Sequence, residues 1–207
     1  MKTARPDFRP APAELILASA SAGRARVLRA SGMTFRQQPA AVDERAIEAR
    51  AGTLGAAHLA ERLAQEKARA VGALSREALV LGADQVMECG GQILHKPVDR
   101  AAARAQLTLL RGQTHSLHSA LALACAGEIV WRHVDSAQLT MRDFSDDFLD
   151  AYIEAEGDSL LASVGCYRIE GLGVQLFSRI EGDHFTIIGL PLIPLLDYLR
   201  EHGLLPA

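Results

Sequence analysis

Two acidic residues in the first hundred positions have the character of cation ligands. Asp84 directly follows the apolar run Leu79–Ala83, and Glu44 ends the sequence Val42-Asp43-Glu44. A carboxylate at the end of a buried strand loses its hydration unless a cation or another partner compensates for the loss. Carboxylate oxygens suit Mg²⁺ or Mn²⁺, and a carboxylate can also activate water. Asp84 is therefore a candidate metal ligand and base, and Glu44 a second ligand, although Glu44 taken alone would be interpreted as a solvated surface acid.

Positive charge could come from Lys67 and Lys96, the two lysines outside the N-terminal segment of a chain with 19 arginines. Arg and Lys are not interchangeable where a compact point charge is needed, so two interior lysines in an arginine-rich chain are informative. The alternatives are chance, a Lys67 stem that covers apolar surface, and an ordinary surface Lys96. Beside two carboxylates, the two lysines could neutralise a polyphosphate.

Three further polar side chains fall between the first expected strand and the first expected helix, namely Ser19, Ser21 and Arg24. Hydroxyl groups and backbone N–H groups at a helix N-terminus bind phosphate oxygens. The alternative interpretation is a plain capping serine with a surface arginine. Taken together with the acids and lysines, these residues favour metal-assisted hydrolysis of a phosphate anhydride.

Other chemistries lack their signatures. The chain has no G-x-x-x-x-G-K-[ST] loop, no G-x-S-x-G elbow and no H-E-x-x-H, and Gly171-Leu172-Gly173 lacks the third glycine of a dinucleotide site. His115 and His118 are three apart on an expected strand, so they face opposite sides and make a poor zinc pair.

Composition limits the class of protein further. The net charge of −3 and the pI of about 6.2 argue against a non-specific nucleic-acid binder. Apolar stretches such as Ala120–Ala126 are far too short to span a membrane, and no secretory signal is recognisable. The three cysteines cannot all pair within the chain, which indicates reduced thiols. We therefore expect a cytoplasmic protein that binds neither nucleic acid nor membrane.

The elements that must position these residues predict an α/β fold, with a mixed central sheet flanked by helices. A flexible tail over residues 1–12 precedes a single domain over residues 13–207. Apolar runs and alternation predict strands over 14–19, 34–38, 79–83, 86–89, 92–94, 114–124, 129–141 and 174–177. Helical spacing and capping predict helices over 24–30, 54–74, 99–110, 145–157 and 189–202, with Val42-Asp43-Glu44 in a loop.

At this point a family resemblance is recognisable. The segment LILASASAGRARVLRASGMTF resembles the opening of the Maf family, which usually reads L-x-L-A-S-x-S-P-R-R-x-x-L-L-x-x-x-G. Seven further motifs follow in the family's order, namely VDE, LAQEKARAV, LGADQV, HKP, LRGQTH, YRIEGLG and EGDHFTIIGLPL. Each motif is weak alone, but eight in register over about residues 14–203 make the resemblance strong.

The resemblance implies an inosine-triphosphatase-like fold, often dimeric, and hence a homodimer. It implies a nucleoside triphosphate pyrophosphatase that uses a divalent metal, releases pyrophosphate and keeps non-standard nucleotides out of nucleic acids. Asp84 matches the family's catalytic acid, Glu44 a metal-ligating acid, Lys67 and Lys96 the two motif lysines, and Arg24 one arginine of S-P-R-R. A nucleotide-binding regulator of septum formation with little catalysis is the alternative.

The chain also departs from the family pattern. S-P-R-R is Ser21-Ala22-Gly23-Arg24 here, and D-K-A-G is Ala162-Ser163-Val164-Gly165, so phosphate contacts from those positions are in doubt. Gln85 and Glu170 stand where members that act on dTTP and UTP tend to carry Thr and Gln. This pair resembles the branch that acts on 7-methyl-GTP, and a carboxylate at Glu170 could accept hydrogen bonds from guanine. The alternative is a solvent-facing Glu170 that selects nothing.

Overall fold

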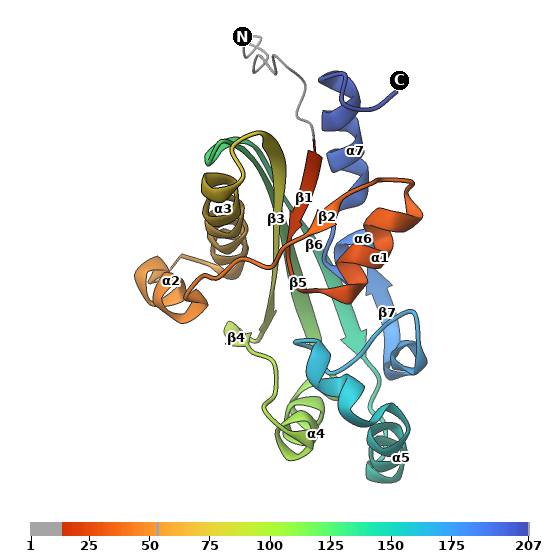
Figure 1. The fold of residues 1–207 in the computed structure, drawn as a ribbon. Coiled ribbons are helices and arrows are strands. Elements are labelled where there is room, and N and C mark those ends of the chain that lie inside the picture. Colours follow the sequence, from red (N-terminus) through yellow and green to blue (C-terminus); the bar gives the residue numbers. More distant parts are fainter. Residues whose placement is uncertain (1–13, 53, 207) are drawn as a thin grey trace.

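A computed structural model describes residues 14–52 and 54–206, so the predicted tail over 1–12 lies outside the described residues. Within the described ranges, the strands form one mixed sheet with helices on both sides, which confirms the predicted fold class (Figure 1). The strands are β1 (Glu14–Ala18), β2 (Arg36–Gln37), β3 (Ala78–Cys89), β4 (Gln92–Leu94), β5 (Thr114–Cys125), β6 (Glu128–Met141) and β7 (Phe177–Glu181). The α-helices are α1 (Ala22–Ala30), α2 (Glu44–Ala51), α3 (Ala56–Leu74), α4 (Arg100–Leu110), α5 (Asp146–Glu156), α6 (His184–Ile188) and α7 (Leu192–Glu201).

The strand order β2-β1-β3-β5-β6-β7 places β3 next to β1, with β4 paired to the far end of β3. β1 runs parallel to both β2 and β3, whereas the other pairs are antiparallel. β1 pairs with β3 as far as Gly82, and β4 pairs with the same edge from Met87 onward. The edge of β3 over residues 83–86 is therefore left without a strand partner.

The prediction that a strand ends before Asp84 is wrong, because β3 continues to Cys89. Asp84 instead lies just beyond the end of the neighbouring strand β1, which stops at Ala18. Its backbone remains paired with Ala120 of β5 on the other edge. Ligands usually bind at the carboxyl end of a parallel strand. Here that end belongs to β1, and the neighbouring β3 continues past it.

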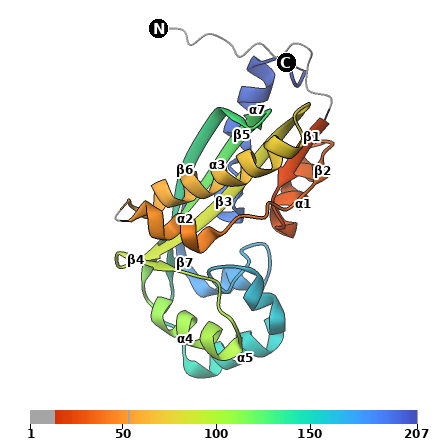
Figure 2. The ribbon, with the colours of Figure 1, turned by 60° about the vertical axis from the view of Figure 1, so that its left-hand side comes forward.

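Helix α3 covers one face of the sheet, and α1, α6 and α7 lie on the other side (Figures 1 and 2). Small side chains bring α3 close to the strands, since Ala60, Ala64 and Ala68 are completely buried against the sheet. A Cβ atom on Gly82 would come within 2.7 Å of the Ala68 nitrogen and closer still to the Ala64 carbonyl oxygen. A glycine is therefore required for this approach of α3 to β3.

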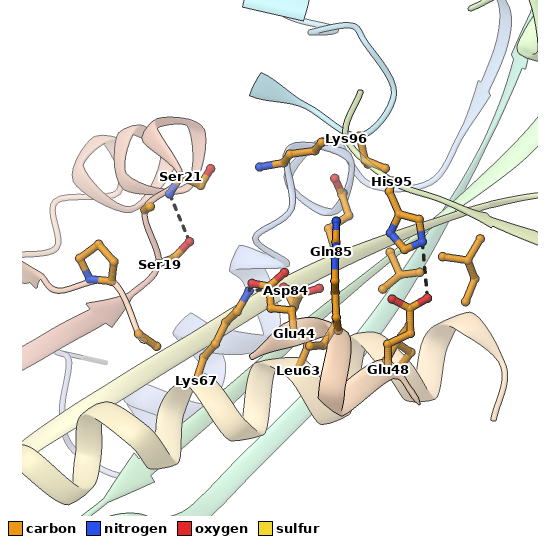
Figure 3. Close-up of a pocket in the computed structure, with 18 of the residues that line it drawn as sticks. Ser19, Ser21, Glu44, Glu48, Leu63, Lys67, Asp84, Gln85, His95 and Lys96 are labelled. Carbon is orange, nitrogen blue, oxygen red and sulfur yellow. Dashed lines mark hydrogen bonds and ion pairs between the residues drawn. The ribbon is translucent and has the colours of Figure 1, made fainter. Parts of the chain in front are cut away.

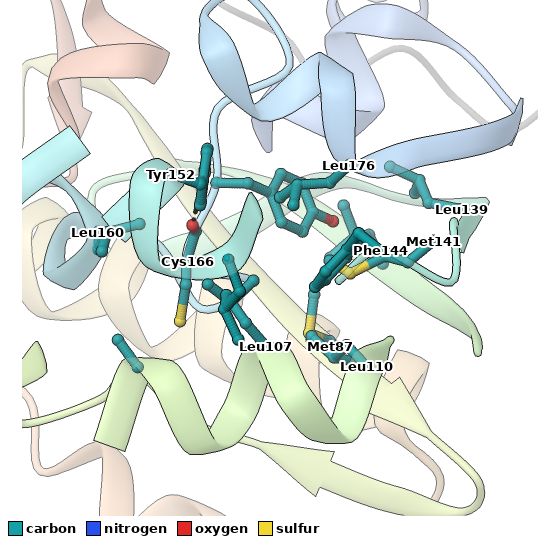
Figure 4. Packing of buried hydrophobic residues seen from close by; sticks show 14 of the residues in the cluster. Met87, Leu107, Leu110, Leu139, Met141, Phe144, Tyr152, Leu160, Cys166 and Leu176 are labelled. Carbon is teal, nitrogen blue, oxygen red and sulfur yellow. Dashed lines mark hydrogen bonds between the residues drawn. The ribbon is translucent and has the colours of Figure 1, made fainter. Parts of the chain in front are cut away.

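The lower part of the molecule in Figure 2 is built from α4, α5 and two 3₁₀ segments, Gly157–Ala162 and Leu172–Leu176. Its core packs Leu107 and Leu110 of α4 against Met87, Leu139 and Met141 of the strands (Figure 4). This second core supports the far ends of β3, β5 and β6, beyond the unpaired edge of β3.

Three further local predictions are wrong. Glu44 is the first residue of α2, capped by the Asp43 side chain, rather than part of a loop. The segment predicted as a strand over 174–177 is largely 3₁₀, and β7 begins only at Phe177. The helix predicted over 189–202 begins at Leu192, and the separate short helix α6 precedes it. In each case the local propensity signal was too short to fix the type or boundary of the element.

Candidate active site

A pocket of about 800 Å³ opens at the unpaired edge of β3 (Figure 3). Its lining comes from the loop between β1 and α1, from α2, from α3, from β3 and from the segment after β4. Consecutive residues of a strand point to opposite faces of the sheet, so Asp84 faces α3 while Gln85 faces α6. The pocket therefore passes across the edge of the sheet and receives side chains from both faces.

The Lys67 ammonium group lies between two carboxylates at the α3 side of this pocket. It forms ion pairs with Asp84 and, at 2.6 Å, with Glu44 (Figure 3). The side chains of Lys67 and Asp84 are only 12% and 10% exposed, whereas that of Glu44 is 57% exposed. Three residues predicted from separate motifs are thus brought together from α2, α3 and β3.

Burial raises the pKa of Asp84, and the Lys67 ammonium and the Arg24 guanidinium act against that rise. A carboxylate with a raised pKa is a better proton acceptor than a solvated one, provided that it stays ionised. The two neighbouring cations favour the ionised form. The site therefore supplies a buried carboxylate suited to activating water.

Arg24 is half-buried, and the protein itself uses most of its hydrogen-bond donors. Its Nη1 donates to Ser19 Oγ at 3.1 Å and to the Ala83 carbonyl at 2.9 Å, while its Nε donates to the Gly189 carbonyl at 2.8 Å. Burial lowers its pKa, opposed by the charges of Asp84 and Glu44. Arg24 lines the pocket, but its contacts make it primarily a tie between β1, β3 and the end of α6.

Both predicted serines line the pocket and both have internal hydrogen-bond roles. Ser21 is the N-cap of α1, where its Oγ accepts from the Arg24 backbone N–H at 3.3 Å. Ser19 is buried and accepts from Arg24 and from the Ser21 N–H. The capping interpretation therefore holds for Ser21, and the N-terminus of α1 still faces the pocket.

Lys96 follows β4 and extends over the pocket from the side opposite Lys67 (Figure 3). No described carboxylate pairs with it, so within residues 14–52 and 54–206 its charge is available to a ligand. Arg45 on α2 also lines the pocket, and sequence reasoning missed it. The sequence signal that could have identified Arg45 was its position next to Glu44.

Gln85 and Glu170, the predicted pair of base-selecting residues, are not brought together. Gln85 lines the pocket, but Glu170 forms an exposed ion pair with Arg26 of α1 and is not among the lining residues. The predicted contact between the Glu170 carboxylate and a guanine base therefore has no support in this arrangement.

The acidic residues fit a divalent metal only in part. Glu44 and Asp84 meet at one ammonium group, so their hard oxygen atoms are adjacent and suit Mg²⁺ or Mn²⁺. Across the described ranges, no group of three or more His, Cys, Asp or Glu side chains is placed to hold a metal ion. Phosphate oxygens and water would have to complete the coordination, as is usual for Mg²⁺ at phosphate sites.

Comparison with known proteins identifies the family of this chain. Residues 14–202 match the family described as "Maf-like protein", which covers the sheet, both helical layers and every residue of the site. The chain belongs to the Maf family. The resemblance inferred from the eight motifs is thereby confirmed.

Relatives within the family carry two kinds of name. A "Nucleoside triphosphate pyrophosphatase" of Nitrobacter winogradskyi is 51% identical over 92% of this chain and 95% of its own length. One of Caulobacter vibrioides is 49% identical over 91% of this chain and 96% of its own. A "7-methyl-GTP pyrophosphatase" of Rhizobium meliloti is 48% identical over 93% of this chain and 98% of its own. Both names are those of pyrophosphatases.

Proposed function

We propose that this protein is a nucleoside triphosphate pyrophosphatase that cleaves the bond between the α- and β-phosphates. The observation that carries the proposal is the convergence of Asp84, Lys67 and Glu44 at the unpaired edge of β3. The Maf family match and the names of the relatives support the same reaction class. Glu44 and Asp84 would hold a Mg²⁺ or Mn²⁺ ion, which would supply positive charge to the phosphate oxygens.

The residues of this chain have distinct parts in the mechanism. Asp84 accepts a proton from water, and that water attacks the α-phosphorus. The bond from the α-phosphorus to the bridging oxygen breaks, and pyrophosphate leaves with the electron pair. Lys67 keeps Asp84 ionised, and Lys96 stabilises the charge that develops on the departing phosphates. Arg24 holds the backbone of β3 beside Asp84 through the Ala83 carbonyl.

As substrate we propose 7-methyl-GTP within the wider class of modified nucleotides, so that the protein removes non-standard nucleotides before they enter nucleic acids. Support comes from Gln85 at the pocket and from the relatives named 7-methyl-GTP pyrophosphatase. We place the reaction in the cytoplasm. No described helix is long and apolar enough to cross a membrane. A homodimer stays a prediction, which sedimentation velocity tests.

The deciding experiment measures pyrophosphate and orthophosphate release from a panel of 7-methyl-GTP, GTP, UTP, dTTP, ATP and CTP with Mg²⁺ or Mn²⁺. We expect pyrophosphate, its loss with a chelator, and a fall of about 10²–10⁴-fold in Asp84→Asn. Asp197→Asn on the exposed face of α7 is the matched control. Unchanged turnover in Asp84→Asn would refute the assigned role. Nucleotide binding without any turnover would favour the regulator of septum formation.

A further inference from the structure

The segment from Asp183 to Gly189 holds two pocket side chains by its backbone carbonyl groups. It contains the short helix α6, at whose end the Thr186 carbonyl accepts from the backbone N–H of the C-cap Gly189 at 3.0 Å and has further partners among side chains. The Thr186 and Ile187 carbonyls each accept from Gln85 Nε2 at 3.1 Å, and the Gly189 carbonyl accepts from Arg24 Nε. The end of α6 is therefore completed by residues of β3 and α1 that line the pocket.

Beneath α6, a row of polar side chains crosses the sheet. Gln85 of β3 lies opposite Ser119 of β5, which lies opposite Asp135 of β6. Ser119 is completely buried, its Oγ accepting from Gln85 Nε2 at 2.8 Å and donating to the Thr186 carbonyl at 2.7 Å. The Thr186 hydroxyl donates to Asp135 at 2.8 Å. The row anchors α6 and Gln85 to the same three strands.

This row determines which end of the Gln85 amide faces the pocket. Carbonyl oxygens can only accept hydrogen bonds, so the amide nitrogen, and not the oxygen, must face Thr186 and Ile187. No described residue donates a hydrogen bond to Gln85 Oε1. This oxygen is also not one of the described buried polar atoms without a partner, so it is accessible. Since Gln85 lines the pocket, its Oε1 is presented there as a free acceptor.

Resting on the proposed function, we propose that Ser119 and the carbonyls at the end of α6 are positioning groups that restrict Gln85 to accepting a hydrogen bond from the nucleobase. Asp84 and Gln85 face opposite sides of the sheet edge, so a nucleotide with its α-phosphate at Asp84 can extend its nucleoside toward Gln85. Guanine and uracil carry an imino N–H on the pairing edge, whereas adenine and cytosine carry a bare acceptor nitrogen there. The arrangement selects keto bases, because an acceptor that faces another acceptor leaves both unpaired.

The test compares kcat/KM for GTP with that for N1-methyl-GTP, and for UTP with N3-methyl-UTP, by pyrophosphate release. We expect the wild type to favour each N–H substrate by about tenfold or more, and to cleave ATP and CTP poorly. In Gln85→Met this preference falls to nearly one, which separates hydrogen bonding from steric exclusion of the methyl group. In Ser119→Ala the preference falls while kcat for GTP changes less than KM, since the catalytic acid is untouched.

Ser116→Ala, on the opposite face of β5, is the matched control and retains the full preference. Thermal unfolding verifies that each variant is folded. Equal turnover of the methylated and unmethylated nucleotides by the wild type overturns the inference, and so does an undiminished preference in Gln85→Met. Absence of turnover with every nucleotide defeats the proposed function instead. In that case, calorimetric binding of the same nucleotide pairs to wild type and Gln85→Met decides the inference.

Discussion

The single ammonium group of Lys67 forms ion pairs with two carboxylates, one buried and one exposed. Asp84 lies on β3 among buried residues, and Glu44 reaches the same nitrogen from the N-terminus of α2. A compact charge with rotatable donors can satisfy both directions, whereas the planar guanidinium of Arg fits a flat bidentate partner. This requirement accounts for a lysine at position 67 in a chain with 19 arginines and three lysines.

We therefore predict that Lys67→Arg will not restore function. Lys67→Met should lower kcat/KM for pyrophosphate release by about 10²–10³-fold, as expected when a cation beside the reacting phosphate is removed. Lys67→Arg should recover less than a tenth of the lost activity, because the larger head group does not fit a side-chain position that is 12% exposed. Arg69→Lys, at a half-exposed position on the same helix, is the control. Recovery by Lys67→Arg to near wild-type turnover would contradict the argument.

Arg24 and Arg26 are two residues apart on α1 and should differ sharply in their effect on stability. Arg24 holds Ser19, Ala83 and Gly189, whereas Arg26 makes an exposed ion pair with Glu170. Arg24→Met should lower the free energy of unfolding by about 2–4 kcal/mol, since three acceptors lose their donor. Arg26→Met should lower it by about 0–1 kcal/mol. Urea unfolding of both variants measures the difference, and equal losses would argue against the positioning role of Arg24.

At the scale of elements, Asp84, Glu44 and Lys67 could be predicted from the sequence. An acid that follows an apolar run and a lysine in an arginine-rich chain are both recognisable without a structure. It could not reveal the row behind Gln85, since Ser119 and Asp135 have ordinary spacing within their strands and meet only through the register of β3, β5 and β6. The continuation of β3 past Asp84 was missed for a similar reason. The end of β1, which creates the unpaired edge, is a tertiary feature.

The contact between α3 and β3 leads to a prediction about Gly82. In Gly82→Ala the new methyl group meets the backbone of α3 at Ala64 and Ala68, which cannot yield as a flexible side chain would. The helix must shift, and Lys67 on the same helix must shift with it. We expect a loss of about 1–3 kcal/mol in unfolding free energy, as for overpacked cores, and a fall in kcat/KM.

Gly55→Ala provides the matched control for this prediction. Gly55 is the N-cap of α3, has a φ of −57° and has open space where a Cβ would lie. Its substitution should lower stability by no more than about 1 kcal/mol, because Ala is a poorer N-cap than Gly but meets no steric obstacle here. If Gly82→Ala lowers the unfolding free energy and kcat/KM no more than Gly55→Ala does, the close approach of α3 to β3 does not constrain the site.

At the scale of the whole molecule, the pocket depends on the lower core as well as on the sheet. Val164 lines the pocket from the segment between the 3₁₀ turn and Tyr167. The buried Tyr167 hydroxyl bonds to His115 Nε2 of β5 at 2.7 Å, and His115 is itself buried. This one hydrogen bond joins the central sheet to the segment that carries Val164.

The His115 environment predicts how the fold responds to acid. Burial lowers the pKa of His115 from 6.5 to about 4, so the folded state keeps the neutral ring while the unfolded chain takes up a proton below about pH 6.5. The contribution of His115 to the free energy of unfolding is therefore fully present above that pH. It is lost as the pH drops from 6.5 to 4, by roughly 3 kcal/mol in all. His115→Gln keeps a partner for Tyr167 and cannot titrate. The slope of the unfolding free energy against pH, measured by urea unfolding between pH 4.5 and 7, should therefore be smaller by up to the equivalent of one proton. An unchanged slope in His115→Gln would show that the histidine does not link the two cores as a neutral group.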